Sequence, residues 1–390
     1  MAKTFLRVFL PFLLAVFLGS FFSSVNGILS VYLIPEFHLS KAWVGAIFSS
    51  SLLFTALMQF PLGTLIDFYG ARRIQIALLL IASVGMGIFA GAWNPWMLWL
   101  GCFLMGIGLS GGLMAGFKAL RPYVALTQIP LIDGLILSVE VAAGLIASLP
   151  TVMLLHVISW RSLLLIYGFL TLLMAFWFYW FVPDSSDSNH ADTPRLKTQL
   201  LKSKAIFTSG FFWKVVLLVC FAYGSKTAFM GLWVVPWLHS FHQLTLMQIA
   251  KYLLAAGIAN CIGDLSWGFI AERLGHYFKW PVTRVICIGS LLFIVMQILL
   301  MFRLVNIEQY WPWILFGFCN RYTTLAYAAL TQRFEQKLIG STTMAMNIGF
   351  YGIAFLTQFG MGLVPYTVGF SLIIGLQILG LLFYVLSDFM

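Results

Sequence analysis

This chain contains unusually few charged residues. Only 9% of its 390 residues are Asp, Glu, Lys or Arg, whereas 61% are hydrophobic. Soluble domains carry about one quarter charged residues. The mean hydropathy of this chain is +0.97, which implies more apolar surface than a soluble fold can bury. The composition therefore excludes an ordinary soluble protein and favours a chain that lies in a lipid bilayer.

Cysteine and histidine are also sparse, with five and six copies. No cysteine pair has a metal-ligand or redox spacing, and no Ser-His-Asp set or His-x-x-x-His pair gathers at one membrane face. We therefore expect no metal, no cofactor and no enzymatic activity. The net charge of +10 does not indicate a nucleic-acid partner, because most of the basic residues lie in the loops on one side of the predicted spans.

What the sequence has in abundance is long apolar segments. A membrane span needs about 20 mostly apolar residues, and lipid allows only helices or closed barrels to cross it. The alternation of a barrel strand is absent, so the prediction is an all-α membrane protein. Twelve spans are predicted, at 5–34, 42–66, 74–92, 96–117, 129–155, 162–182, 212–238, 246–270, 283–302, 310–331, 339–361 and 365–387.

The basic residues orient these spans. With the N-terminus inside, only Lys41, Arg161 and Arg303 fall on the outer side, and Lys226, Lys251 and Arg321 fall within spans. The other Lys and Arg residues lie in inner loops, which is the positive-inside pattern. Both termini are thus expected to be cytoplasmic.

One polar stretch divides the chain. Residues 184–194 are rich in Asp, Ser, Asn and Pro, which is typical of a connecting loop. The predicted organisation is a six-helix bundle at 1–182, a cytoplasmic central loop at 183–211 and a second six-helix bundle at 212–390. Within the loop, Arg195–Phe207 alternates apolar and basic residues, so it is either a short interfacial helix or a solvated connection.

A short motif occurs once in each half. Gly63-Thr-Leu-Ile-Asp67-Phe-Tyr-Gly70-Ala-Arg72-Arg73 returns in degraded form as Gly268-Phe-Ile-Ala-Glu272-Arg273-Leu-Gly275. Both copies read Gly-x3-acid-x2-Gly after an apolar span. The repeat predicts a duplicated bundle with one function-bearing loop in each half.

These residues resemble the signature loop of the major facilitator superfamily (MFS). Trp160-Arg161 is similar to that family's Trp-Arg pair at the outer end of helix five, and Gly340–Asn347 resembles its entry into helix eleven. The resemblance implies two pseudo-symmetric six-helix bundles and a monomer that transports a small solute by alternating access in a bacterial inner membrane.

The resemblance also implies a cytoplasmic latch. The signature acid, here Asp67, is expected near the start of helix eleven, where free N–H groups stabilise a carboxylate. Arg72 and Arg73 are its expected ion-pair partners, although they could instead only anchor the loop at lipid headgroups. The full predicted latch set is Gly63, Asp67, Gly70, Arg72, Arg73, Asp264, Gly268, Glu272 and Arg273.

Ionisable residues inside spans are costly in hydrocarbon and mark function. Glu140, Lys226 and Arg321 each fall near the middle of a span. An anionic or zwitterionic solute could bind the two cations, while Glu140 meets an amine or exchanges a proton; alternatively, Glu140 only pairs with one of the cations. Further cavity candidates are Asn26, Asn260, Asn320, Tyr223, Asn347 and Tyr351.

Two departures from the family pattern affect the functional prediction. Many members carry an arginine four residues before a glycine in helix four, where this chain has Cys102 before Gly106, and the fifth span lacks the Gly-Pro pair of antiporters. In the family that arginine is tied to proton coupling, so coupling in this chain would have to run through Glu140, and the missing Gly-Pro pair argues against multidrug efflux. We therefore expect uptake of an organic anion or amino-acid-like solute, driven by the proton gradient. The alternatives are a proton-driven exporter of amphiphiles and a transport-inactive solute sensor.

Overall fold

In the computed structural model, residues 1–4, 121–128, 184–203, 335–337 and 390 are left undescribed, and all regular elements in the remainder are helices. The chain divides into two compact units, residues 1–194 and 195–390. This division falls inside the predicted central loop. Of the candidate interfacial helix Arg195–Phe207, only residues 204–207 lie in the described part, and they are helical.

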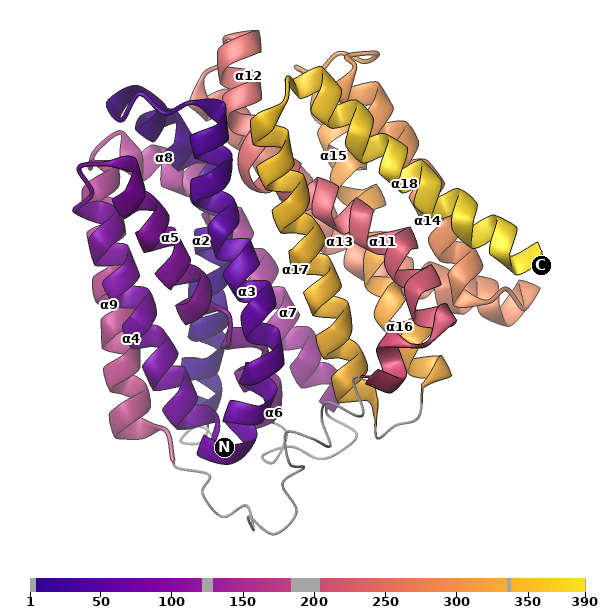
Figure 1. The fold of residues 1–390 in the computed structure, drawn as a ribbon, viewed down its shortest axis with the longest axis horizontal. Helices are drawn as coiled ribbons and strands as arrows, with labels where there is room; N and C mark the ends of the chain where they lie inside the picture. Colours follow the sequence, from indigo (N-terminus) through magenta and orange to yellow (C-terminus); the bar gives the residue numbers. More distant parts are fainter. Residues whose placement is uncertain (1–4, 121–128, 184–203, 335–337, 390) are drawn as a thin grey trace. The chain divides into compact units, whose positions relative to one another are not determined.

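The N-terminal unit is a bundle of long helices (Figure 1). In it, α4 packs against α5 and α9, and α2 packs against α7. Its elements are η1 (Phe5–Phe9), α2 (Leu10–Glu36), α3 (Lys41–Tyr69), α4 (Ala71–Ala90), α5 (Pro95–Leu109), α6 (Gly112–Leu120), α7 (Ile129–Ile146), α8 (Leu149–Leu155) and α9 (Trp160–Phe181).

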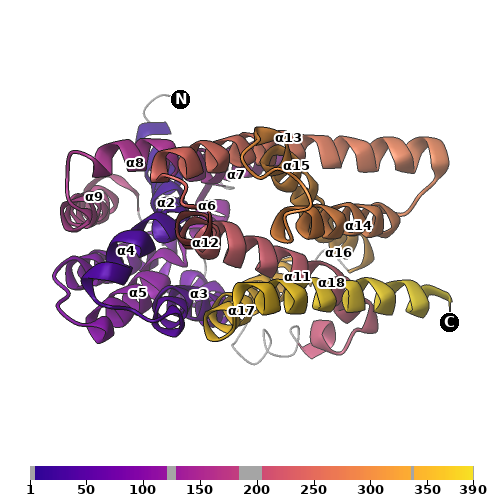
Figure 2. The ribbon, with the colours of Figure 1, turned by 90° about the horizontal axis from the view of Figure 1, so that it is seen from above.

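The C-terminal unit is a second helix bundle. Its α11 packs against α17 and α18, and its α13 lies beside α15 (Figure 2). Its elements are α11 (Gly210–Ala228), η5 (Phe229–Trp233), α12 (Val234–His242), α13 (Leu246–Phe278), α14 (Val282–Met301), α15 (Tyr310–Asn320), η6 (Arg321–Thr324), α16 (Leu325–Arg333), α17 (Ile339–Leu363) and α18 (Tyr366–Phe389).

Each predicted span coincides with one helix or with consecutive helical segments. Several helices begin where the sequence supplies a capping side chain: the oxygens of Ser40, Asn94, Ser159 and Thr245 accept hydrogen bonds from first-turn N–H groups. Five predicted spans consist of more than one helical segment, the clearest case being 310–331, which the 3₁₀ turn η6 divides into α15 and α16.

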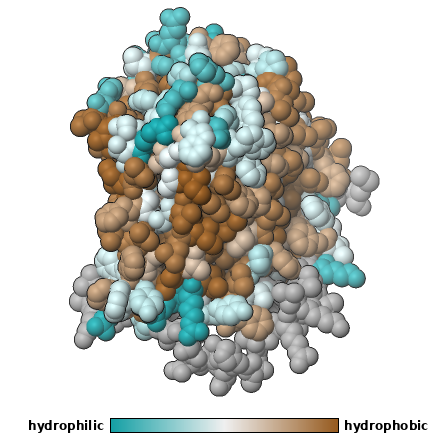
Figure 3. Space-filling model, turned by 60° about the vertical axis from the view of Figure 1, so that its left-hand side comes forward, coloured by the Kyte–Doolittle hydropathy of each residue, from teal (hydrophilic) through white to brown (hydrophobic). Residues whose placement is uncertain are grey.

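The outer surfaces of these helices suit lipid. Leu165, Phe169 and Phe176 on α9 are all exposed. On the face drawn in Figure 3, hydrophobic side chains cover the middle, and hydrophilic ones gather at the top and, in smaller number, near the lower edge. Within the described residues, ten helices are long and apolar enough to cross a membrane. The all-α membrane architecture expected from the sequence is confirmed.

Candidate functional site

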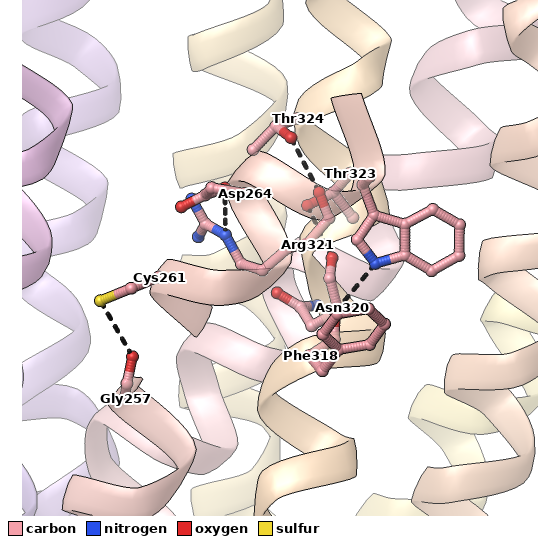
Figure 4. A network of polar contacts seen from close by, with 9 residues as sticks. Gly257, Cys261, Asp264, Phe318, Asn320, Arg321, Thr323 and Thr324 are labelled. Atoms are coloured by element: carbon pink, nitrogen blue, oxygen red, sulfur yellow. Dashed lines mark hydrogen bonds and ion pairs between the residues drawn. The ribbon is translucent and has the colours of Figure 1, made fainter. Parts of the chain in front are cut away.

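The strongest polar contact inside the C-terminal bundle joins Arg321 to Asp264 (Figure 4). The guanidinium donates from Nε to Oδ1 and from Nη2 to Oδ2, both at 2.6 Å. This bidentate geometry is the strong form of an Arg–carboxylate contact. The side chains remain 18% and 27% exposed, so a ligand or water can still reach them.

Asp264 lies near the middle of the 33-residue helix α13. It stands roughly 27 Å along the axis from Leu246 and roughly 21 Å from Phe278, at 1.5 Å per residue. The prediction had placed Asp264 in the cytoplasmic latch set, whereas the structure pairs it with Arg321.

A break in the helix presents Arg321 to α13. The 3₁₀ turn η6 replaces α-helical geometry at residues 321–324. Two hydroxyl groups donate hydrogen bonds to backbone carbonyls there, Thr323 Oγ1 to Asn320 O and Thr324 Oγ1 to Arg321 O. Trp267 Nε1 donates to Phe318 O at 2.9 Å. A 3₁₀ stretch within a helix often marks a functional hinge, and here it carries the arginine.

Two glycines allow α13 and α15 to approach closely. A Cβ on Gly263 would lie 2.9 Å from Cγ of Arg321, and a Cβ on Gly317 would lie 2.3 Å from the carbonyl oxygen of Ala256. Small residues have this role at membrane helix interfaces. The close packing lets the arginine side chain lie along α13 and reach Asp264.

Polar atoms without partners lie next to the pair in the sequence. Asn320 precedes Arg321 and is only 1% exposed, yet neither its Oδ1 nor its Nδ2 has a hydrogen-bond partner in the described structure. Asn260, one turn before Asp264 on α13, has an unpartnered Oδ1. Buried amides are normally satisfied, so both carry unused capacity for a polar ligand or water.

A second cluster joins α11, α16 and α17. The Tyr223 ring stacks on Phe350 with centroids 4.3 Å apart and lies 6.4 Å from the Tyr351 ring. Tyr327 donates its hydroxyl proton to Asn347 Oδ1 at 2.5 Å. The structure thus brings together three predicted residues, Tyr223, Asn347 and Tyr351.

Lys226 is one helical turn after Tyr223 on α11, a spacing that places the two on one face. It is half-buried and already takes part in an interaction within the chain. Helix α11 also contacts η6. The element that carries Lys226 therefore touches the turn that carries Arg321.

In the N-terminal unit, Glu140 and Asn26 lie on helices that pack together, α7 and α2. Glu140 is half-buried and takes part in an interaction within the chain. Asn26 is 5% exposed and its Oδ1 has no partner in the described structure. The unit thus has a carboxylate and an unused amide oxygen on neighbouring helices.

The first copy of the repeated motif spans the junction of α3 and α4. Gly63 and Asp67 lie on α3, and Gly70 ends that helix with φ 81°, a conformation that favours glycine. Arg72 Nε donates to Phe178 O at 3.1 Å, and its Nη2 donates to Tyr179 O. Arg72 therefore binds carbonyls at the C-terminal end of α9, a contact that the latch prediction did not include.

The Asp67 side chain lies outside the described part of the chain, so its latch role stays a prediction. Arg73 is exposed and takes part in an interaction within the chain.

The second copy is not a loop, and this part of the prediction is wrong. Gly268, Glu272 and Arg273 lie inside α13, which continues to Phe278 instead of ending near residue 270. The turn comes at Lys279, with φ 52°. Glu272 is exposed, and the Arg273 guanidinium lies over the Phe269 ring at 4.6 Å.

Sequence reasoning missed Glu36, the partner of the Trp160-Arg161 pair. Trp160 Nε1 donates to Glu36 Oε2 at 2.7 Å, and Arg161 Nη2 donates to Glu36 Oε1 at 2.6 Å. Arg161 Nη1 also donates to the carbonyls of Ala90 and Ala92 at the end of α4. The position of Glu36 at the end of the first span, opposite a known Trp-Arg pair, was the available signal.

A buried amide chain was also missed. Gln297 Nε2 donates to Ser225 Oγ at 2.6 Å, and Gln377 Nε2 donates to Gln297 Oε1 at 2.8 Å, with all three side chains fully buried. It links α14 to α11 and α18. Uncharged glutamines are common enough in spans that the sequence gave no reason to select these.

No group of three or more His, Cys, Asp or Glu side chains that could hold a metal occurs among the residues with described positions. The five cysteines are free thiols, three of them buried. The arrangement offers charge pairing and hydrogen bonding in the interior of helix bundles, which suits reversible solute binding.

Comparison with known proteins identifies the class. The family model described as Major Facilitator Superfamily matches residues 12–358. The chain therefore belongs to the major facilitator superfamily, as its signature residues suggested. It is a multi-pass membrane transporter of small solutes and not an enzyme.

Two characterised relatives are similar along much of the chain. The sialic acid transporter NanX of Escherichia coli (strain K12) is 25% identical over 365 residues, which cover 87% of this chain and 84% of that protein. The probable sulfoacetate transporter SauU of Cupriavidus necator is 22% identical over 281 residues, which cover 68% of this chain. The match spans 64% of the length of SauU, slightly less than two thirds.

Solved structures show the same fold. A bacterial homologue of the human lysosomal transporter Spinster superposes with a TM-score of 0.78 at 16% identity, covering 99% of this chain and 96% of the other. The nucleoside transporter NupG gives a TM-score of 0.74 at 14% identity, covering 96% and 98%.

Proposed function

We propose that this protein is a proton-coupled importer of a small organic anion in a bacterial inner membrane. It acts as a monomer, with both termini and residues 183–211 on the cytoplasmic side. The charge distribution of the loops supports this orientation. Relatives that transport sialic acid and sulfoacetate support the substrate class, because both solutes are organic acids.

The observation that carries the proposal is Arg321. An arginine inside a membrane span is energetically costly, so its presence there indicates a function. Its planar guanidinium can bind a carboxylate or sulfonate through two parallel hydrogen bonds. Its bidentate contact with the Asp264 carboxylate supports the proposal that this position binds an oxyanion. Lys226, on a helix that touches the same turn, supplies a second cation for the substrate.

Proton coupling needs a carboxylate inside a span. Two are available, Glu140 on α7 and Asp264 on α13. Protonation of either group compensates the entry of an anion. The cytoplasmic latch around Asp67 remains part of the proposal, with Arg73 as its basic partner.

Uptake into proteoliposomes tests this function. The probes are labelled sialic acid and sulfoacetate, with labelled uridine as an uncharged comparison, each with and without an inward proton gradient. We expect saturable uptake of at least one anion, stimulated by the gradient, and no uptake of uridine. Arg321→Ala and Lys226→Ala are each expected to raise KM tenfold or more.

The proposal fails if neither anion enters at a rate above that of empty liposomes, or if both variants keep the wild-type KM. The aromatic cluster of Tyr223, Phe350 and Tyr351 is the feature that favours the exporter alternative. Gradient-driven efflux of amphiphilic dyes in place of anion uptake would establish that alternative.

A further inference from the structure

We propose that Asp264 and Arg321 form a proton-switched anion site, in which protonation of Asp264 releases Arg321 to bind the substrate. The inference rests on the proposed function and assigns the coupling carboxylate, for which Glu140 was the sequence-based candidate. It starts from the geometry: the only described hydrogen-bonding partner of the Arg321 side chain is the Asp264 carboxylate, bound through two donors at 2.6 Å.

The charges of the site explain why proton and anion move together. The empty site holds one guanidinium and one carboxylate and is neutral. The site with both a protonated Asp264 and a bound anion is also neutral. A proton alone leaves the site with a charge of +1, and an anion alone leaves it with −1.

These half-loaded states are expensive because the pair lies near the middle of α13. An uncompensated charge inside a membrane-spanning helix bundle is energetically unfavourable. The conformational change of the transporter is therefore restricted to the empty and the fully loaded site, and this restriction makes the transport coupled.

The exchange balances atom by atom. A proton from the aqueous phase bonds to one Asp264 oxygen, and the two hydrogen bonds that the carboxylate accepted from Nε and Nη2 of Arg321 are lost. The guanidinium then donates from the same two groups, Nε and Nη2, to two oxygens of the incoming anion. On the other side of the membrane the anion leaves, the proton dissociates, and the Asp264–Arg321 contact forms again.

Neighbouring amides provide unused hydrogen-bonding capacity for the substrate. Asn320 is almost fully buried beside Arg321, and both polar atoms of its amide lack a partner in the described structure. The Asn260 Oδ1, one turn before Asp264, is also unpartnered. The site thus offers a planar fork for an oxyanion and nearby acceptors for substrate hydroxyl or amide protons.

The titratable groups around Asp264 are few. Arg321 comes from η6, and Cys261 lies on α13 itself, where its thiol donates to the Gly257 carbonyl (Figure 4). The phenol of Tyr322 follows Arg321 and contacts Trp267 ring to ring. The arginine is charged at all accessible pH values, so Asp264 is the member of the pair that can exchange a proton.

The test separates uphill transport from exchange. Asp264→Asn imitates the protonated carboxyl and cannot release a proton. We expect this variant to lose gradient-driven accumulation of the carboxylate or sulfonate probe, at least tenfold, while counterflow exchange of that probe across preloaded liposomes continues. Glu308→Gln is the control, since it removes an exposed carboxylate from the same unit, outside every predicted site, and is expected to leave both activities unchanged.

A pH series gives a second readout. In wild-type protein the KM for exchange is expected to rise about tenfold per pH unit once Asp264 is deprotonated, whereas in Asp264→Asn it stays constant with pH. If the variant does not fold, proton uptake by the wild-type protein on probe binding tests the proposal: we expect one proton to be taken up for each anion bound.

The inference is overturned if Asp264→Asn still accumulates the probe against a gradient, or if binding takes up no proton. These outcomes differ from failure of the proposed function, in which wild-type protein itself moves no anion. Suppose that Glu140→Gln abolishes accumulation but leaves exchange intact, whereas Asp264→Asn still accumulates the probe. The coupling carboxylate is then Glu140, and the inference is wrong.

Discussion

At the scale of single residues, Arg321 is bound rather than free. Its two donors to Asp264 are satisfied before any substrate arrives. An anion that binds here must replace a carboxylate, so the net gain in affinity from the guanidinium alone is small. Binding becomes strong only when Asp264 is neutral, and this condition ties affinity to pH.

Asn320 gives the sharpest residue-scale prediction. A buried amide with no partner costs about 1–3 kcal/mol, so Asn320→Leu, of similar size, should leave the thermal midpoint unchanged or raise it. The same variant should raise KM for the anion severalfold, because the amide's unused atoms are the ones available to the substrate. Uptake kinetics and thermal unfolding in detergent measure both effects.

Asn347→Ala is the comparison for this variant. It removes the acceptor of the Tyr327 hydroxyl and should lower stability by about 0.5–1.5 kcal/mol. A clear loss of stability in Asn320→Leu with unchanged KM would mean that the amide has a structural role.

The sequence identified Arg321 but not its partner. An arginine among apolar residues is a strong signal because of its cost in lipid. Asp264 was predicted for the latch because it lies one turn before Gly268 of the second motif copy, and nothing in the sequence links it to Arg321. The predicted end of this span near residue 270 was too early, since glycine inside a membrane helix is well tolerated. The first strong breaker is Pro281, and the helix in fact continues to Phe278.

At the scale of elements, the contact between α13 and α15 sets the distance from Asp264 to Arg321. Gly317→Ala would place a Cβ 2.3 Å from the Ala256 carbonyl oxygen, so the helices must separate. Overpacking of this kind costs about 1–3 kcal/mol. We expect a lower thermal midpoint together with reduced uptake.

Gly268→Ala is the matched control, because it lies on α13 and its Cβ would meet nothing within 4 Å. Replacing an open helical glycine by alanine should be neutral or stabilise by up to about 1 kcal/mol. If both variants lost thermal stability and uptake equally, the close packing at Gly317 would not be the cause of the loss.

The positions of the elements could be predicted better than their internal breaks. Long apolar runs fix the spans, and capping residues such as Ser40 and Thr245 fix helix starts. The turn η6 has no comparable signal, because Asn-Arg-Tyr-Thr-Thr contains neither Gly nor Pro. Its geometry depends on tertiary contacts such as that of Trp267 with the Phe318 carbonyl.

At the scale of the whole molecule, charge and hydropathy define the orientation in the membrane. A cysteine-free variant carrying Ser186→Cys should resist an impermeant thiol reagent added to intact cells, whereas one carrying Asn306→Cys should react. The reason is that residue 186 belongs to the basic inner side and residue 306 follows Arg303 on the outer side. The reverse pattern of labelling would invert the proposed topology.

The central claim is that each anion crosses with a proton carried on Asp264. The most direct test records anion and proton fluxes together, using a labelled anion and a pH-sensitive dye inside proteoliposomes. The account predicts that wild-type protein acidifies the lumen in proportion to anion uptake, and that Asp264→Asn exchanges anion with no acidification. Acidification of equal size in the variant would contradict it.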